Sequence, residues 1–126
     1  MALRGEQDIV LSRQAVRKLT NELKFSIVDQ TKMITAASEL SRNTVVYGGG
    51  GEMRWEILRE ANRVELRLHF EDKGPGIPDV ELALKDGWTS GSGMGMGLSG
   101  SKRLVNEFHI RTAVGEGACI TITRWK

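Results

Sequence analysis

The chain has 126 residues, 40% of them hydrophobic and 27% charged, which is typical of one globular domain with a single core. Its 18 basic and 16 acidic residues leave a net charge of +2, too small and too interspersed to indicate a nucleic-acid-binding surface. One cysteine cannot form an internal disulfide, and no apolar run approaches the roughly 18 residues that span a membrane. We therefore expect a single cytoplasmic domain over residues 1–126 that binds neither nucleic acid nor membrane.

The first part of the chain is predicted to be helical. Apolar residues recur at near-helical spacing from Asp8, a candidate cap, to about Leu23. A second helix is expected from Ser26 to about Tyr47. The four glycines at 48–51 end it, because their backbone entropy opposes a helix.

The second part of the chain is predicted to mix strands and helices. Apolar residues alternate with polar ones over 53–57 and 64–70, and Ala61-Asn62 between them is a candidate hairpin turn. The other expected elements are a short helix at 79–85, a long helix at about 98–108, and closing strands at about 110–114 and 118–125.

Glu39 and Asn43 lie four residues apart on the second predicted helix, so their side chains project from one face. A carboxylate at such a position can accept a proton or orient a nucleophile, and an amide oxygen one turn later can coordinate Mg²⁺. Taken alone, the pair favours a solvated helix face. Its functional interpretation therefore depends on the other motifs.

The segment from Asp72 to Pro78 directly follows the strand that ends near Phe70. Gly74 and Gly76 allow the backbone to approach a flat ligand closely, and a carboxylate there can accept a hydrogen bond from an exocyclic amine such as that of adenine. The alternative is a proline–glycine turn with a capping aspartate.

A glycine-rich stretch from Gly91 leads into the third long predicted helix. Backbone N–H groups at such glycines, together with a helix N-terminus, bind phosphate, and Lys102 either reaches that phosphate or faces solvent. A Rossmann site is excluded by context, because residues 86–90 are polar and broken where a buried strand is required. No Gly-Lys-Ser/Thr follows at the Walker A spacing either.

These segments stand in the order found in GHKL ATPases, and the chain resembles the small bacterial anti-sigma-factor serine kinases of that superfamily. It is most similar to the RsbT-type switch kinases of the stressosome. The shared segments are 28–30, 39–43, 72–79, the glycine-rich stretch into 102–104, and 115–117. The resemblance implies the GHKL (Bergerat) ATP-binding fold, an α+β two-layer sandwich whose mixed, mostly antiparallel sheet is covered on one face by helices.

The resemblance also implies a role for each matching residue. Glu39 matches the general base that orients the acceptor hydroxyl, Asn43 matches the Mg²⁺ ligand, and Asp72 matches the carboxylate that reads the adenine amino group. The other implied ATP-binding positions are Gly74, Gly76 and Ile77 in the adenine-side turn, Gly93, Gly95 and Gly97 in the phosphate lid, and Lys102.

The chain departs from the family pattern at Ala118, where a threonine hydroxyl commonly supports the adenine site. One missing hydrogen bond costs about 1 kcal/mol, so weaker ATP affinity is expected without loss of binding.

The resemblance implies a serine/threonine kinase that uses Mg-ATP to phosphorylate a STAS-domain scaffold or antagonist protein of a stressosome. On release, such a kinase binds and activates a PP2C-type phosphatase. Two alternatives remain from the sequence: an anti-sigma factor kinase that sequesters a sigma subunit, and a nucleotide-gated binding module with little turnover. Retention of both Glu39 and Asn43 favours a kinase over the binding module.

Overall fold

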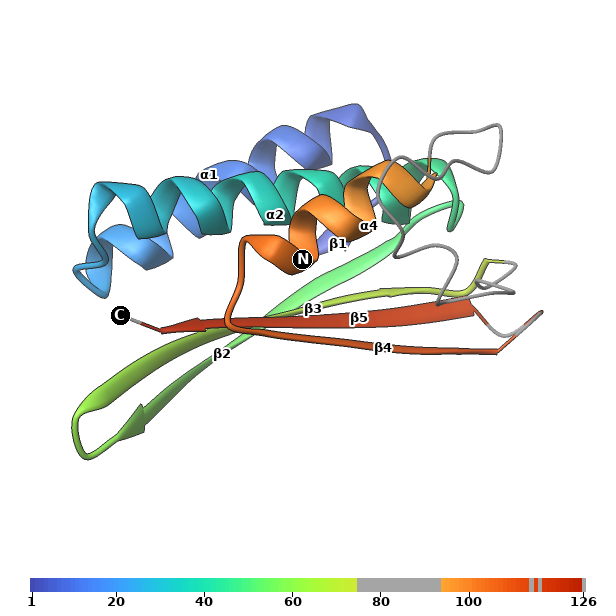
Figure 1. Ribbon diagram of the computed structural model, residues 1–126. Coiled ribbons are helices and arrows are strands. Elements are labelled where there is room, and N and C mark those ends of the chain that lie inside the picture. Colours follow the sequence, from blue (N-terminus) through green and yellow to red (C-terminus); the bar gives the residue numbers. More distant parts are fainter. Residues whose placement is uncertain (75–93, 114, 116, 126) are drawn as a thin grey trace.

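A layer of helices covers one face of an antiparallel sheet in the computed structural model, which describes residues 1–74, 94–113, 115 and 117–125 (Figure 1). The helices are α1 (Glu6–Glu22), α2 (Ile27–Val46) and α4 (Met94–Arg103). The strands are β1 (Ala2–Leu3), β2 (Gly51–Glu60), β3 (Arg63–Asp72), β4 (Glu107–Ala113) and β5 (Gly117–Trp125). Within these residues the five-stranded sheet has the order β1-β2-β3-β5-β4, and each neighbouring pair is antiparallel.

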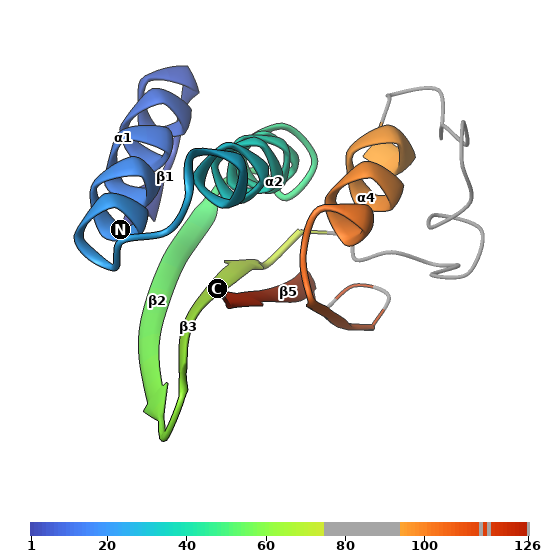
Figure 2. The same ribbon diagram turned by 60° about the vertical axis from the view of Figure 1, so that its left-hand side comes forward.

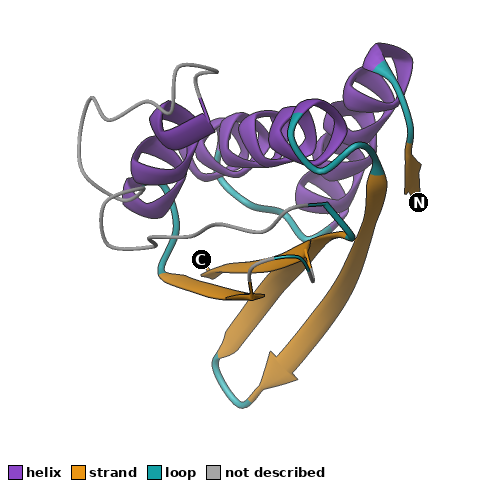
Figure 3. Cartoon of the chain, turned by 90° about the vertical axis from the view of Figure 1, so that its right-hand side faces the viewer, coloured by secondary structure: helices purple, strands orange, loops and turns teal. Residues whose placement is uncertain are grey.

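This arrangement confirms the predicted fold class, since all described helices lie on the same face of the sheet (Figure 3). The predicted helix at 79–85 falls outside the described residues. None of the helices in the described part of the chain has the length and apolar character needed to cross a membrane.

The start of α2 is confirmed and the predicted cap of α1 is wrong. Ser26 Oγ accepts a hydrogen bond from the Asp29 N–H at 3.1 Å and caps α2. Helix α1 instead begins after Gly5, so Asp8 lies within its first turn. There the Asp8 carboxylate accepts hydrogen bonds from the N–H groups of Arg4 (2.7 Å) and Gly5 (3.3 Å), which places negative charge at the helix N-terminus.

The predicted hairpin is confirmed, because Glu60 pairs with Arg63 and leaves only Ala61-Asn62 in the turn. The hairpin reaches well past the helical layer (Figure 2). The short strand β1 was not predicted, since two residues carry no readable periodicity.

The elements near the C-terminus differ from the predicted ones. Helix α4 runs from Met94 to Arg103 instead of 98–108, and Phe108 belongs to β4. The sheet determines this boundary: Asn106 N–H donates to the Thr123 carbonyl at 2.9 Å, and Asn106 Oδ1 accepts from the Trp125 N–H at 3.0 Å. Strand pairing thus begins where helical spacing alone predicts another turn.

Helix α2 is the central element of the helical layer and lies between α1 and α4 (Figure 2). Its inner face packs on β3 and β5, and the contributing residues are fully or nearly buried. They are Met33, Ala36, Ala37 and Leu40 from α2, with Leu66, Leu68, Phe70, Ile120 and Ile122 from the strands. The position of α2 therefore fixes where its polar residues lie relative to the strand ends.

Arg124 of β5 joins the sheet to two other elements. Its Nε donates to Asp29 Oδ1 in the first turn of α2 at 3.2 Å, and its Nη2 contacts the same oxygen. Its Nη1 donates to the Leu104 carbonyl just after α4 at 2.7 Å. The hydrogen bond from Arg124 lowers the pKa of Asp29 below its ordinary value of 3.8, while burial acts in the opposite direction.

Arg124→Gln should lower the free energy of unfolding by about 1 kcal/mol at pH 7, because a partly buried carboxylate loses its charged partner. Since the folded-state pKa of Asp29 is depressed, this stabilisation exists above the unfolded pKa and is lost as pH falls through the folded pKa. Urea denaturation at pH 7 and at low pH measures both effects. Arg54→Gln is the control, because Arg54 and its partner Glu52 are exposed and its other partner Glu71 is only half-buried, so the loss should stay below about 0.5 kcal/mol. Equal losses in the two variants would contradict the assignment.

Candidate nucleotide site

The C-terminal end of α2, the end of β3 and the start of β5 meet at one edge of the sheet. Asp72 is the last residue of β3 and is paired with Gly51 on one side and Ala118 on the other. Helix α2 ends beside it, and Asn43 lies in the last turn of that helix. The fold therefore brings Asn43, Asp72 and Gly74, three predicted site residues, to the same region.

Asp72 is half-buried, and its carboxylate is held by backbone. The Gly74 N–H donates to Asp72 Oδ1 at 2.9 Å. Burial raises the pKa of Asp72 above its ordinary value of 3.8, while the backbone N–H groups of Gly74 and Ala118 act in the opposite direction. The Asp72 carboxylate is therefore a partly desolvated hydrogen-bond acceptor whose orientation is set by backbone N–H groups. Recognition of an exocyclic amine requires such an acceptor.

Glycines make room for this carboxylate. A Cβ atom at Gly48 would overlap Cβ and Cγ of Asp72 and lie 2.7 Å from its Oδ2. A Cβ atom at Gly74 would lie 2.8 Å from Cα of Gly48, and one at Gly117 would overlap the Asp72 carbonyl oxygen. Gly117 also has a φ of +85°, which L side chains rarely adopt. Asp72 is thus enclosed by backbone that tolerates no side chain.

Sequence reasoning missed Gly48 and Gly117 as site residues. Gly48 was interpreted only as the end of a helix, and Gly117 only as part of the segment 115–117 shared with the RsbT-type kinases, without a role at the site. A glycine that permits close approach has the same sequence signal as one that ends a helix, so the distinction needs the structure.

Asn43 is only 8% exposed, and its Nδ2 has no hydrogen-bond partner within the described residues. An unpaired buried amide costs about 1–3 kcal/mol, which indicates a position shaped for a ligand. Half a turn about the last side-chain bond exchanges the nitrogen and the oxygen, so the same position can present an oxygen to a hard cation. The Asn43 side chain thus fits Mg²⁺ held together with phosphates.

Ser101 of α4 is the second buried polar group without a partner in the described part of the chain. It is fully buried on a helix that packs beside α2 (Figure 2). No feature of the glycine-rich motif singles it out.

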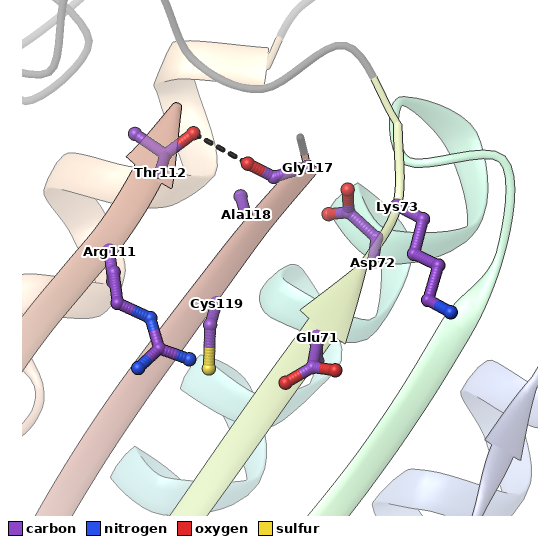
Figure 4. A pocket seen from close by; sticks show the side chains of 8 residues that line it. All are labelled: Glu71, Asp72, Lys73, Arg111, Thr112, Gly117, Ala118 and Cys119. Carbon is purple, nitrogen blue, oxygen red and sulfur yellow. Dashed lines mark hydrogen bonds between the residues drawn. The ribbon is translucent and has the colours of Figure 1, made fainter. Parts of the chain in front are cut away.

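Asp72 borders two hollows at the edge of the sheet. One of about 300 Å³ is lined by the ends of β3, β4 and β5 and includes Thr112 and Ala118 (Figure 4). The other, of about 540 Å³, is lined by Gly48–Glu52 and Glu71–Lys73. Thr112 of β4 lies directly across from Ala118 of β5, and its hydroxyl donates a hydrogen bond to the Gly117 carbonyl at 2.8 Å. A hydroxyl is therefore present next to the position where the family threonine is missing.

Glu39 lies one turn before Asn43 on α2 and lines a different hollow. It is exposed and lines a groove of about 520 Å³ between α1 and α2. Val10, Arg13 and Arg17 of α1 and Ile34 of α2 line the same groove. Glu39 and Asn43 are one turn apart, yet one is exposed in the groove and the other is buried.

The remaining predicted residues are distributed over α4 and the segment before it. Gly95 and Gly97 lie within α4, which begins four residues earlier than predicted. Lys102 is exposed in the last turn of α4, so its predicted phosphate contact stays a prediction. Gly76, Ile77 and Gly93 lie outside the described residues.

Comparison with known proteins supports the nucleotide-binding interpretation of this geometry. Residues 28–126 match the family described as histidine kinase-, DNA gyrase B-, and HSP90-like ATPase. The chain belongs to this ATPase family. The serine/threonine-protein kinase RsbT of Bacillus subtilis (strain 168) is 42% identical over 120 residues, which cover 95% of this chain and 90% of that protein. The predicted family of RsbT-like serine/threonine kinases and its ATP-binding domain are thus confirmed.

Gly48→Ala should weaken ATP binding at least about tenfold, because the new methyl group displaces the Asp72 carboxylate, which we expect to accept a hydrogen bond from adenine. Isothermal titration calorimetry measures the affinity. Gly5→Ala is the control, since nothing lies within 4 Å of the added Cβ atom. Unchanged affinity in a folded Gly48→Ala variant would show that Asp72 does not depend on this contact.

Asp72→Asn should weaken ATP binding about 100-fold, since an amide donor then faces the adenine amine. The melting temperature at pH 7 should not fall. The folded-state pKa of Asp72 is raised, so any stability it contributes is present at low pH and lost as pH rises through that pKa. Wild-type ATP affinity should correspondingly fall as pH is lowered through the raised pKa. A variant that binds ATP normally would remove Asp72 from the site.

Proposed function

We propose that this chain transfers the terminal phosphoryl group of Mg-ATP to a serine or threonine of a STAS-domain partner in a bacterial stress-signalling pathway. The observation that carries the proposal is the half-buried Asp72 carboxylate beside the buried Asn43, whose Nδ2 has no partner within the described residues, in a chain 42% identical to the kinase RsbT. By the same similarity, we place the reaction in the cytoplasm, on the scaffold or antagonist proteins of a stressosome.

Asp72 accepts a hydrogen bond from the adenine amino group, and Gly48 and Gly74 let the backbone close around its carboxylate. Asn43 presents its amide oxygen to Mg²⁺, which neutralises phosphate charge when bound. We assign Gly76 and Ile77 to the adenine side, and Gly93, Gly95, Gly97 and Lys102 to the phosphate side. The main contribution of these residues is to hold the reacting groups in line.

Glu39 orients the acceptor hydroxyl or removes its proton. Its exposure in the α1–α2 groove suits this role, because the acceptor belongs to another protein and must reach the carboxylate from solvent. Arg13 and Arg17 give the groove positive charge beside the apolar Val10 and Ile34. A partner segment with apolar and acidic side chains next to its serine complements this surface.

Release from the phosphorylated partner frees the same chain to bind and activate a PP2C-type phosphatase. Support for this step comes from the similarity to RsbT over nearly the whole length of both chains. Phosphorylation adds negative charge to the partner. This charge changes the electrostatic fit between the partner and the α1–α2 groove, which carries both Glu39 and the arginines Arg13 and Arg17.

Glu39→Gln should leave ATP and partner affinity near normal while slowing phosphoryl transfer by about 10²–10⁴-fold, because the amide keeps the shape but cannot take a proton. Single-turnover transfer of radiolabelled phosphate from ATP to a purified STAS partner measures the rate. Glu22→Gln, at an exposed position on α1, is the matched control and should react at the wild-type rate. A Glu39→Gln variant as fast as the wild type would exclude the catalytic role.

Ala118→Thr should tighten ATP binding about fivefold, the equivalent of one hydrogen bond of about 1 kcal/mol. The test is calorimetry with Thr112→Val as the companion variant, because Thr112 holds a hydroxyl across from position 118. If Ala118→Thr leaves affinity unchanged while Thr112→Val lowers it, Thr112 already supplies the hydroxyl and the expected gain is contradicted.

A further inference from the structure

The outer edge of β2 is paired over only part of its length. Strand β1 covers Gly51 and Glu52, and Met1 exchanges hydrogen bonds with Met53. Beyond Met53, no strand within the described ranges pairs with this edge from Arg54 to Glu60. The β2–β3 hairpin carries that edge past the helical layer (Figures 1 and 2). An open edge is a template for another strand.

The hydrogen bonds of Met53 show which backbone groups of β2 point outward from this edge. Its N–H donates to the Met1 carbonyl at 2.8 Å, and its carbonyl accepts from the Met1 ammonium at 2.9 Å, so both groups point outward. In an antiparallel ladder these directions alternate along the strand. The N–H and C=O groups of Trp55, Ile57 and Arg59 therefore point outward too.

The edge also exposes two large apolar side chains. Trp55 is 44% exposed and Ile57 is 40% exposed, although both lie on the helix-side face of the sheet. Their cross-strand neighbours Leu68 and Leu66 are fully buried. The helical layer thus covers β3 at this level but leaves the apolar face of β2 open to a partner.

We propose that a second copy of this chain pairs with this edge, antiparallel and centred on Ile57. In that register Ile57 faces Ile57 of the other copy, Trp55 faces Arg59, and Arg54 faces Glu60. The pairing uses the whole open stretch from Arg54 to Glu60. Each outward group of Trp55, Ile57 and Arg59 gains a partner, and the two-fold axis passes between the two Ile57 residues.

Charge complementarity selects this register. Arg54 and Glu60 have opposite charge and meet twice across the two-fold axis, and Trp55 meets the Arg59 guanidinium in a cation–π pair. A register centred on Trp55 would place Ile57 opposite Met53, whose outward groups are already bonded to Met1. A register centred on Arg59 would place two arginines face to face. A register centred on Leu58 would place Glu56 opposite Glu60, and one centred on Glu56 would place Arg59 opposite Met53. The Ile57-centred register avoids all of these conflicts.

The proposed dimer joins the two five-stranded sheets edge to edge. Asp72 lies at the opposite end of the hairpin from its turn, so both nucleotide sites remain accessible. The interface is small for a protein dimer, and we expect a dissociation constant in the micromolar range. Sedimentation velocity from low micromolar to about 200 micromolar should show a monomer–dimer equilibrium.

Residue 57 faces its own copy only in the proposed register, and this allows a specific test. Ile57→Lys and Ile57→Glu should each raise the dimer dissociation constant at least tenfold, because like charges meet at the axis. A one-to-one mixture of the two variants should restore the dimer. Circular dichroism and melting temperature confirm that each variant folds, as the exposure of Ile57 leads us to expect.

Crosslinking tests the register independently in a Cys119→Ser background, which removes the only native thiol. Opposed residues in a hydrogen-bonded antiparallel pair have Cα atoms about 5.5 Å apart, within disulfide range. Ile57→Cys should oxidise to a covalent dimer, and Trp55→Cys alone should not. A mixture of Trp55→Cys with Arg59→Cys should crosslink.

Three results would overturn the proposal. The first is a monomer at every concentration, and the second is a dimer that crosslinks equally through Trp55→Cys and Ile57→Cys. The third is a monomeric chain whose residues 55–59 gain protection from hydrogen exchange only when a partner protein is added. That result would assign the edge to an extended segment of the partner.

Discussion

The site depends on one steric constraint, the close approach of the Gly48 backbone to the Asp72 side chain. Helix α2 and strand β3 end against each other there, with no space for a side chain at position 48. The contact fixes the Asp72 carboxylate relative to the last turn of α2, which carries Asn43. Because α2 is packed between α1, α4 and the sheet, the two ends cannot separate without disturbing the core.

The same region carries energetic costs. Burial disfavours the ionised form of Asp72, and the buried Nδ2 of Asn43 has no partner in the described part of the chain. Elsewhere, the buried hydroxyls of Ser41 and Thr20 are paired: Ser41 donates to Ser12 at 2.8 Å, and Thr20 donates to the Val16 carbonyl at 2.8 Å. Such local violations concentrate where a ligand compensates for them.

The sequence predicted those parts of the molecule whose signals are local. The Ser26 cap, the glycine end of α2 and the Ala61-Asn62 turn each determine a boundary within a few residues. Long-range contacts decided the rest: sheet pairing of Asn106 moved the start of β4, and the role of Gly48 depends on Asp72, a residue 24 positions away.

The different surroundings of Glu39 and Asn43 could not be predicted from the sequence either. Four residues turn a helix by about 400°, so the two side chains differ by about 40° in direction. Because helices lie on both sides of α2, this difference in direction is enough to leave Glu39 exposed in the α1–α2 groove while Asn43 is buried.

Helix α4 is held unequally at its two ends. Arg124 fixes the chain at Leu104 directly after its C-terminus. Toward the N-terminus, Gly95, Gly97 and Gly100 each disfavour helix by about 1 kcal/mol relative to alanine. The first turns of α4 are therefore intrinsically weaker as helix than a glycine-free segment would be, while the last turn remains docked. A ligand that prefers coil over helix at these glycines shifts the helix–coil equilibrium at reduced free-energy cost, without displacing α4 from α2.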